Sequence, residues 1–182
     1  MTKQKKIITS SIELPKAVIF DTDNTLYPYT PAHNEATHAV EEKVEKMLGI
    51  KKEDFRITFK EAREEIKDRL GNVASSHSRL LYMQTTIEKL ELGTRILLTL
   101  DLEQTYWRTF LNSCRLFPSV LNFIQLLKSK GIVTANITDL TAQIQFRKLV
   151  YFGLDEFFNY VVTSEEAGMD KPNKQPFELA LK

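Results

Sequence analysis

Short apolar runs alternate with stretches of helical periodicity near both ends of this chain. The segments KAVIF at 16–20, GIVTANIT at 131–138 and YVVT at 160–163 have the length and composition of buried strands. Short apolar strands separated by helices are typical of a parallel sheet that is covered on both faces. The pattern therefore predicts an α/β fold.

The middle of the chain, residues 30–115, has helical periodicity and few helix breakers. Its first helix is expected to have Thr30 as N-cap and Gly49 as its stop. The helices of this region are expected at 31–48, 52–70, 79–90 and 101–111. The apolar segment 96–100 fits more than one state. Because helix follows helix without a strand, we expect a small bundle.

The alternation of helix and strand returns after Pro118. Further helices are expected at 120–130, 142–152 and 175–181. We therefore predict an α/β core made of residues 1–29 and 116–182, interrupted after its first strand by a helical insert at 30–115.

Two aspartates, Asp21 and Asp23, follow the first predicted strand in the segment AVIFDTDNTLYPY. Open α/β sheets bind ligands at the carboxyl ends of their strands, which is where these residues fall. A carboxylate oxygen of Asp21 and the backbone carbonyl of Asp23 could share a hard cation such as Mg²⁺. One carboxylate can also act as a nucleophile while the other carries a proton.

Other interpretations of this aspartate pair are a turn or a helix cap, because Asp and Asn are favoured in both. A calcium-binding EF-hand loop is excluded, because it would need Gly in place of Leu26 and Glu in place of Ala32. Taken singly, Thr138 is interpreted as a turn residue and Lys171 as a solvated surface charge.

Three motifs in order resemble the haloacid dehalogenase (HAD) superfamily. FDTDNTLY resembles its first motif, Thr138 in NITDL the second, and Lys171 in GMDKPNKQPF the third. The segment TAQIQFRKLVYFGLDEFFNYVVTSEEAGMDKP is similar to the phosphatase branch. The resemblance implies a HAD-like Rossmannoid parallel sheet, and it identifies the helical insert at 30–115 as a type 1 cap.

The resemblance also implies a magnesium-dependent phosphatase that acts on a small metabolite, either a sugar phosphate or a nucleotide. Asp21 would become the aspartyl phosphate, and Asp23 would be the general acid and base. Both would also be the metal-binding residues. Thr138 would donate a hydrogen bond to the phosphoryl group and Lys171 would neutralise its charge, since phosphoryl transfer depends on positioning and neutralisation.

Four further residues are expected at the substrate. Thr25 would fix the turn of the first motif, and Asp139 follows the second. His77 and Arg79 lie in or beside a polar loop of the cap that could face the site and contact the leaving group. A helix cap and a solvated face remain the alternative for these two cap residues.

The composition of the chain limits the kinds of molecule that it is expected to bind. Lys and Arg total 25 against 24 Asp and Glu, so the charge of +1 gives no reason to expect nucleic acid or an anionic membrane. The single cysteine, Cys114, excludes an internal disulfide and a thiolate-cluster zinc site. No apolar run reaches membrane-spanning length. We expect a cytoplasmic protein.

Two features depart from the superfamily pattern. Asn136 lies in a predicted buried strand, where an unpaired amide would cost about 1–3 kcal/mol. The fourth, acidic motif would follow one more helix and strand, whereas this sequence ends at Lys182. We expect a truncated or split version of a longer phosphatase. The alternatives are a sheet edge protected by self-association or by a complementing segment, and a non-catalytic binding or regulatory module. A true dehalogenase is disfavoured, because halide needs no proton from Asp23.

Overall fold

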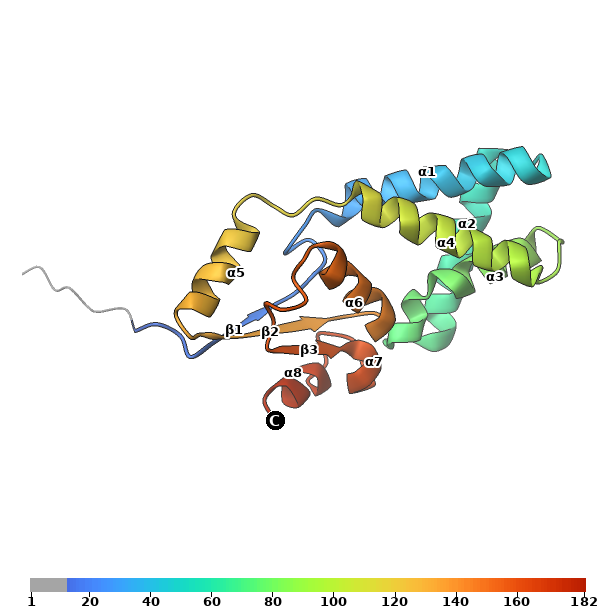
Figure 1. Cartoon of the computed structure of the whole chain (residues 1–182). Coiled ribbons are helices and arrows are strands. Elements are labelled where there is room, and N and C mark those ends of the chain that lie inside the picture. The colour runs from blue at the N-terminus through green and yellow to red at the C-terminus, as the bar shows by residue number, and fades with distance from the viewer. Residues whose placement is uncertain (1–12) are drawn as a thin grey trace, which may run out of the picture.

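The chain contains a small parallel sheet beside a larger group of helices (Figure 1). A computed structural model describes residues 13–182, and residues 1–12 of the predicted core lie outside that range. Within the described residues, β1 (Ala17–Phe20), β2 (Val133–Thr138) and β3 (Tyr160–Thr163) form one parallel sheet in the order β1-β2-β3. Phe20 pairs with Asn136, and Thr138 pairs with Thr163. The predicted α/β class is confirmed.

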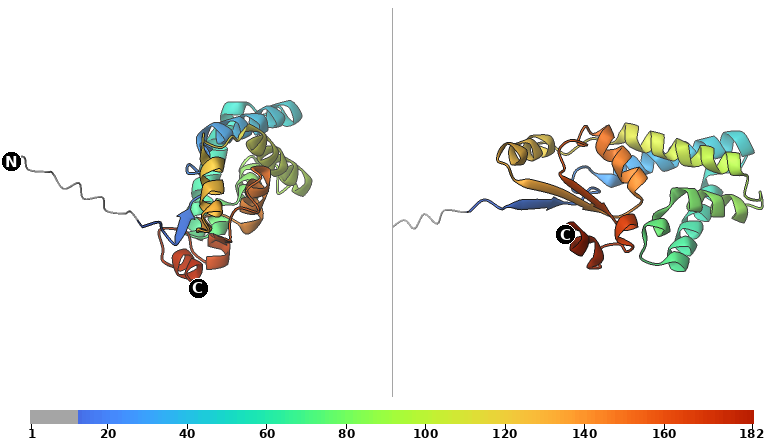
Figure 2. Two further views of the ribbon diagram at one scale, coloured as in Figure 1. Left: turned by 60° about the vertical axis from the view of Figure 1, so that its left-hand side comes forward. Right: turned by 60° about the horizontal axis from the view of Figure 1, so that its bottom comes forward.

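Helices cover both faces of this sheet. In two views, α5 (Val120–Ser129) and α6 (Ala142–Tyr151) lie on one face, and α8 (Gln175–Ala180) lies on the other (Figures 1 and 2). The short helix α7 (Ser164–Ala167) follows β3 directly and was not predicted from the sequence. Two helices on one face follow from the parallel order, because successive crossovers of the same hand return on the same side.

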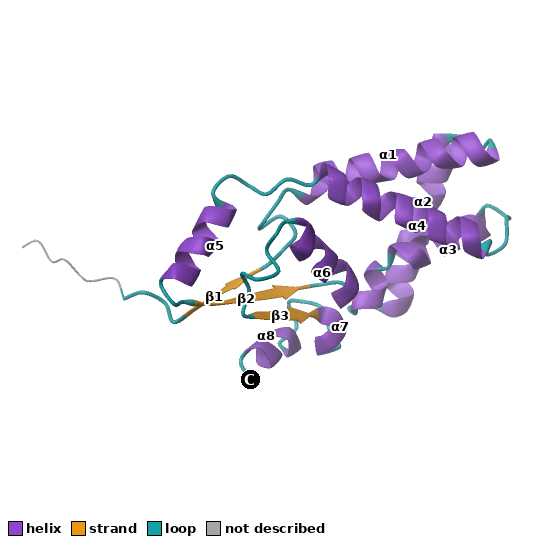
Figure 3. Cartoon of the chain, viewed as in Figure 1, coloured by secondary structure: helices purple, strands orange, loops and turns teal. Residues whose placement is uncertain are grey.

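The helical insert lies between β1 and β2 in sequence and extends beyond the sheet (Figure 3). Its elements are α1 (Tyr29–Leu48), α2 (Lys52–Leu70), the 3₁₀ helix η1 (Ala74–His77), α3 (Arg79–Lys89) and α4 (Ile96–Ser113). In the described residues, no helix is long and apolar enough to cross a membrane. The division into a core and a separate cap domain at 30–115 stays a prediction.

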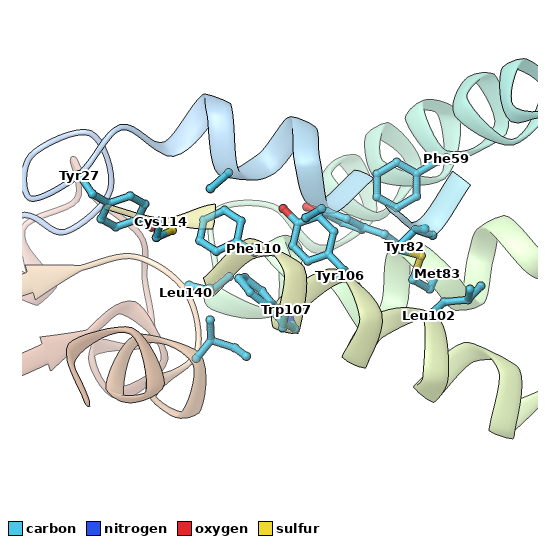
Figure 4. Packing of buried hydrophobic residues seen from close by; sticks show 14 of the residues in the cluster. Tyr27, Phe59, Tyr82, Met83, Leu102, Tyr106, Trp107, Phe110, Cys114 and Leu140 are labelled. Carbon is cyan, nitrogen blue, oxygen red and sulfur yellow. The ribbon is translucent and has the colours of Figure 1, made fainter. Parts of the chain in front are cut away.

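One buried cluster joins the insert to the sheet region. It runs from Phe59 and Met83 in the insert, through Trp107 and Phe110 of α4, to Tyr27 in the loop after β1 (Figure 4). Phe110 and Tyr27 are fully buried and their rings meet edge to face. The loop after β1 is therefore packed against the insert as well as held by the sheet.

Several element boundaries differ from the sequence prediction, most of them by one or two residues. The first helix begins at Tyr29 instead of 31, and its N-cap is Pro28 instead of the predicted Thr30. Asn24 Oδ1 accepts the Tyr29 amide hydrogen at 3.0 Å. The undecided segment 96–100 is the start of α4, although Leu97 is 85% exposed. Its helical state follows from continuity with the buried stripe that begins at Thr99 and Leu102.

Candidate active site

A hollow of about 280 Å³ opens at the carboxyl ends of the strands, between the sheet and the helical insert. On the sheet side it is lined by Asp21, Asp23, Asn24, Thr138, Asp139 and Leu140, and on the insert side by Tyr29, Arg63, Lys67, His77, Arg79 and Tyr82. The parallel strands thus bring the first two motifs together, as the sequence predicted.

Asn136 holds the loop that carries the aspartates. Its Oδ1 accepts a hydrogen bond from Thr22 Oγ1 at 2.9 Å, and its Nδ2 donates to the Phe20 carbonyl at 3.4 Å. Both Thr22 and Asn136 are fully buried. The buried amide is therefore paired with the end of β1 and with the loop that follows it, so it is not the unpaired group that would cost stability.

Lys171 lies against Asp21, 150 residues away in sequence. Its Nζ donates to Asp21 Oδ1 at 2.6 Å and to the Ile137 carbonyl at 2.9 Å, while its amide donates to Asp139 Oδ1 at 2.9 Å. Burial raises the pKa of the Asp139 carboxyl, and this effect exceeds that of Lys171, which lowers the pKa. The first and third motifs therefore meet at one ion pair, and Asp139 holds the loop of Lys171.

Asp23 is held by two donors that the sequence did not predict. Lys148 Nζ donates to Asp23 Oδ1 at 2.7 Å, and the Tyr27 hydroxyl donates to the same oxygen. Burial, followed by the charge of Asp23, raises the pKa of Tyr27, so this hydroxyl keeps its proton. Both donors fix the direction of the carboxylate, which is 34% exposed toward the hollow.

Lys148 is 1% exposed, which is unusual for a lysine. Its ammonium lies 5.5 Å from the ring centre of Phe110 and 5.8 Å from those of Tyr27 and Trp107. Aromatic faces and one carboxylate thus replace the water that it loses. The sequence did carry a sign of this burial, because Lys148 lies on the same face of α6 as Ile144 and Gln145.

We expect Lys148→Met to lower kcat for a phosphomonoester about 10- to 100-fold, since misplacing a reacting group by about 1 Å can cost about 100-fold. Steady-state rates of phosphate release check this effect. Lys128→Met is the matched control, since Lys128 lies 5.1 Å over the Phe157 ring but away from the hollow. Equal rates for both variants would contradict this role.

The other predicted site residues take different places. Thr138 is 2% exposed and lines the hollow, and its Oγ1 makes a long 3.5 Å contact with the Asp139 carbonyl. His77 Nε2 lies 3.0 Å from Asp170 Oδ2, so it joins the insert to the loop before Lys171. Thr25 is exposed in the turn and is not part of the lining. The roles predicted for these residues stay predictions.

Arg79 lines the hollow on the side of the insert. Its Nη1 donates to the His77 carbonyl at 2.7 Å, its Nη2 donates to the Tyr29 hydroxyl, and its guanidinium lies 5.3 Å from the Trp107 ring centre. A guanidinium keeps its charge in such surroundings and can offer further donors to a ligand. Arg79 therefore lies at the hollow, and its role in contacting a substrate stays a prediction.

The groups that could hold a cation are the Asp21 carboxylate and the Asp23 backbone carbonyl. Asp21 is 42% exposed, and Lys171 engages only its Oδ1. Within residues 13–182, no three His, Cys, Asp or Glu side chains are grouped so as to hold a metal ion. The donor set fits a Mg²⁺ ion that keeps several of its waters.

The sequence pattern of the haloacid dehalogenase-like hydrolases matches residues 15–182. This chain belongs to the haloacid dehalogenase-like hydrolase family. The match covers the β1 loop, the helical insert and the Lys171 loop, so the predicted superfamily and enzyme class are confirmed.

Relatives of this hydrolase cover nearly the whole chain. It is 35% identical over 166 residues to the ribulose-1,5-bisphosphate 5-phosphatase of Halopiger xanaduensis, and the alignment covers 91% of this chain and 70% of that protein. It is 32% identical over 168 residues to the glyceraldehyde 3-phosphate phosphatase of Methanothermobacter thermautotrophicus, and the alignment covers 92% of this chain and 70% of that protein.

Solved structures share its fold. A HAD-hydrolase from Bacillus subtilis bound to magnesium has a TM-score of 0.66 and 19% identity, and the alignment covers 92% of this chain and 73% of that one. A HAD phosphatase from Thermococcus onnurineus has a TM-score of 0.63 and 23% identity, over 90% of this chain and 69% of that one. The parallel sheet with an inserted helical region is therefore the HAD-like fold.

Proposed function

We propose that this hydrolase is a magnesium-dependent phosphatase of small sugar phosphates that works through an aspartyl phosphate. The observation that carries the proposal is the pair of aspartates in one hollow, each with its own lysine: Lys171 on Asp21 and Lys148 on Asp23. The names of the relatives favour a sugar phosphate over a nucleotide. The proposal assigns one carboxylate to bond formation and the other to proton transfer.

In the first step, a carboxylate oxygen of Asp21 attacks phosphorus. The bond between phosphorus and the ester oxygen breaks, and that oxygen leaves with the electron pair and takes a proton from Asp23. Lys171 offsets charge on Asp21 and the phosphoryl oxygens, and Thr138 Oγ1 donates to one of them. The alcohol then departs and leaves an aspartyl phosphate.

In the second step, water attacks the phosphorus of the aspartyl phosphate while the Asp23 carboxylate takes its proton. The bond to the Asp21 oxygen breaks, and orthophosphate is released. The Tyr27 and Lys148 donors keep the Asp23 carboxylate directed at the reacting oxygens throughout. A Mg²⁺ ion bound by the Asp21 carboxylate and the Asp23 carbonyl would neutralise charge between Asp21 and the incoming phosphoryl group.

Removal of Mg²⁺ tests the proposal. We expect excess EDTA to lower kcat/KM for glyceraldehyde 3-phosphate and phenyl phosphate by about 100-fold or more, because cation neutralisation of the transition state contributes several kcal/mol. Added Mg²⁺ should restore the rate, as measured by release of inorganic phosphate. Absence of turnover with saturating Mg²⁺, beside retained binding of a sugar phosphate, would instead favour a binding or regulatory module.

A further inference from the structure

We propose that Arg63 and Lys67 of α2, together with Arg79, bind a second phosphate group of the substrate, so that the preferred substrates are small sugar bisphosphates. This inference rests on the proposed function, because the first phosphate is taken to lie at Asp21. It assigns a binding role to two residues of the insert that the motifs do not include.

The two α2 side chains face the hollow from the side opposite Asp21. Arg63 and Lys67 are four residues apart, hence one helical turn apart on one face, and both line the hollow. Arg79 lines it from the start of α3. Two helices therefore place three cationic side chains of the described chain around the insert side of one small cavity.

Arg63 and Lys67 differ from the other basic residues of α2 because those residues are paired with glutamates. Lys52, Arg56, Lys60 and Arg69 each lie within 4.0 Å of a glutamate carboxylate. In contrast, no carboxylate of residues 13–182 forms a salt bridge with Arg63, Lys67 or Arg79. Glutamates of α1 and α2 thus neutralise the other cations of the helix, and its charges toward the hollow stay available to an anion.

The unneutralised charges also affect the pKa values of nearby side chains. Burial, and then the charges of Arg63 and Arg79, lower the pKa of Lys67. Burial, and then Arg79 and Arg63, lower the pKa of His33 to about 4. Asp170 opposes the effect on Lys67, but its Oδ2 already contacts His77 at 3.0 Å. An anion placed among the three cations would relieve their mutual repulsion.

The size and polarity of the hollow limit what that anion can belong to. At about 280 Å³ the hollow lies at the lower end of ligand-binding cavities. One wall holds the reacting carboxylate with Lys171, and the other holds the cation cluster. A short polyol chain with a phosphate at each end matches this distribution of charge, and a second phosphate can accept from guanidinium and ammonium donors together.

Binding of phosphonates, which cannot be hydrolysed, tests the subsite directly. The probes are pentane-1,5-diylbisphosphonate, pentylphosphonate and 5-phosphonopentanoate, measured by calorimetry at low ionic strength with the full protein and Mg²⁺, because salt screens such contacts. We expect the bisphosphonate to bind about 30-fold tighter than pentylphosphonate, and Arg63→Met or Lys67→Met each to reduce this preference about tenfold.

Arg69→Met is the matched control, because it removes a positive charge from α2 outside the hollow, and it should keep the preference. Lys67→Arg should restore most of the preference lost in Lys67→Met. An equal preference in wild type, Arg63→Met and Lys67→Met overturns the subsite. Binding of 5-phosphonopentanoate as tight as that of the bisphosphonate overturns the assignment to a second phosphate in favour of a carboxylate.

Turnover of phenyl phosphate separates this inference from the proposed function. A protein that hydrolyses phenyl phosphate but shows no bisphosphonate preference contradicts the subsite alone. A protein that hydrolyses no phosphomonoester but shows a preference dependent on Arg63 and Lys67 contradicts the phosphatase alone.

Discussion

Replacing Asp21 with asparagine should lower kcat for phenyl phosphate by on the order of 10⁴-fold or more, the size of loss that removal of an enzyme's nucleophile causes. The amide can still accept a hydrogen bond from Lys171 Nζ, which lies 2.6 Å from Asp21 Oδ1, but its oxygen is too weak a nucleophile to form the phosphoryl bond. The measurement is single-turnover phosphate release at saturating Mg²⁺.

Folding of the Asp21→Asn variant must be shown to be intact for this result to count. Since Asp21 is 42% exposed, its melting temperature should stay close to that of the parent. Asp155→Asn provides the control, because Asp155 is an exposed aspartate outside the hollow. A folded Asp21→Asn protein that keeps the parental rate would rule out the aspartyl phosphate.

Replacing Asp23 with asparagine should produce a loss that depends on the leaving group. For glycerol phosphate, whose alcohol must be protonated as it leaves, we expect kcat to fall about 10²- to 10⁴-fold, the usual contribution of general acid catalysis. For p-nitrophenyl phosphate the first step should fall much less, because p-nitrophenolate leaves without a proton. Hydrolysis of the aspartyl phosphate still lacks its base, so a burst of about one equivalent of p-nitrophenol should precede slow turnover.

Rapid mixing with optical detection of p-nitrophenol measures that burst. The Asp155→Asn protein should show neither the burst nor the selective loss on glycerol phosphate. Equal losses on both substrates with no burst would mean that Asp23 has a structural role through its contacts with Lys148 and Tyr27 instead of a proton-transfer role. The melting temperature of Asp23→Asn then reports how much those contacts stabilise the loop.

Local pattern was enough to predict much of the fold and the reacting end of the site. The second helix, 52–70, was predicted with the observed bounds, because its apolar residues repeat at helical spacing and Gly71 ends it. Asp21 was placed at the ligand-binding edge because it follows a strand, and the resemblance to the superfamily added Thr138, which lines the same hollow. The resemblance to the superfamily added Lys171, which the structure joins to Asp21.

The remaining site residues could not be predicted, because their environment comes from distant parts of the chain. Lys148 lies on the buried face of its helix, but its partners are aromatic rings of the insert and Asp23, 125 residues earlier, which no local pattern identifies. Asn136 looked like an unpaired amide until its partner Thr22, 114 residues away, was known. Arg63 and Lys67 resemble the other α2 cations in sequence, and only the packing of the insert over the strands distinguishes them.

Sequence alone therefore determined most of the segments that form helices and strands and the motif residues that are candidates for the chemistry, because hydrophobic periodicity and strand ends are local properties. Only the tertiary structure decided which of the described charged side chains are paired with an opposite charge and which line the hollow without such a partner. The energy of a charge depends on burial and on neighbours within a few ångströms, and those neighbours are brought together only when the insert packs against the sheet.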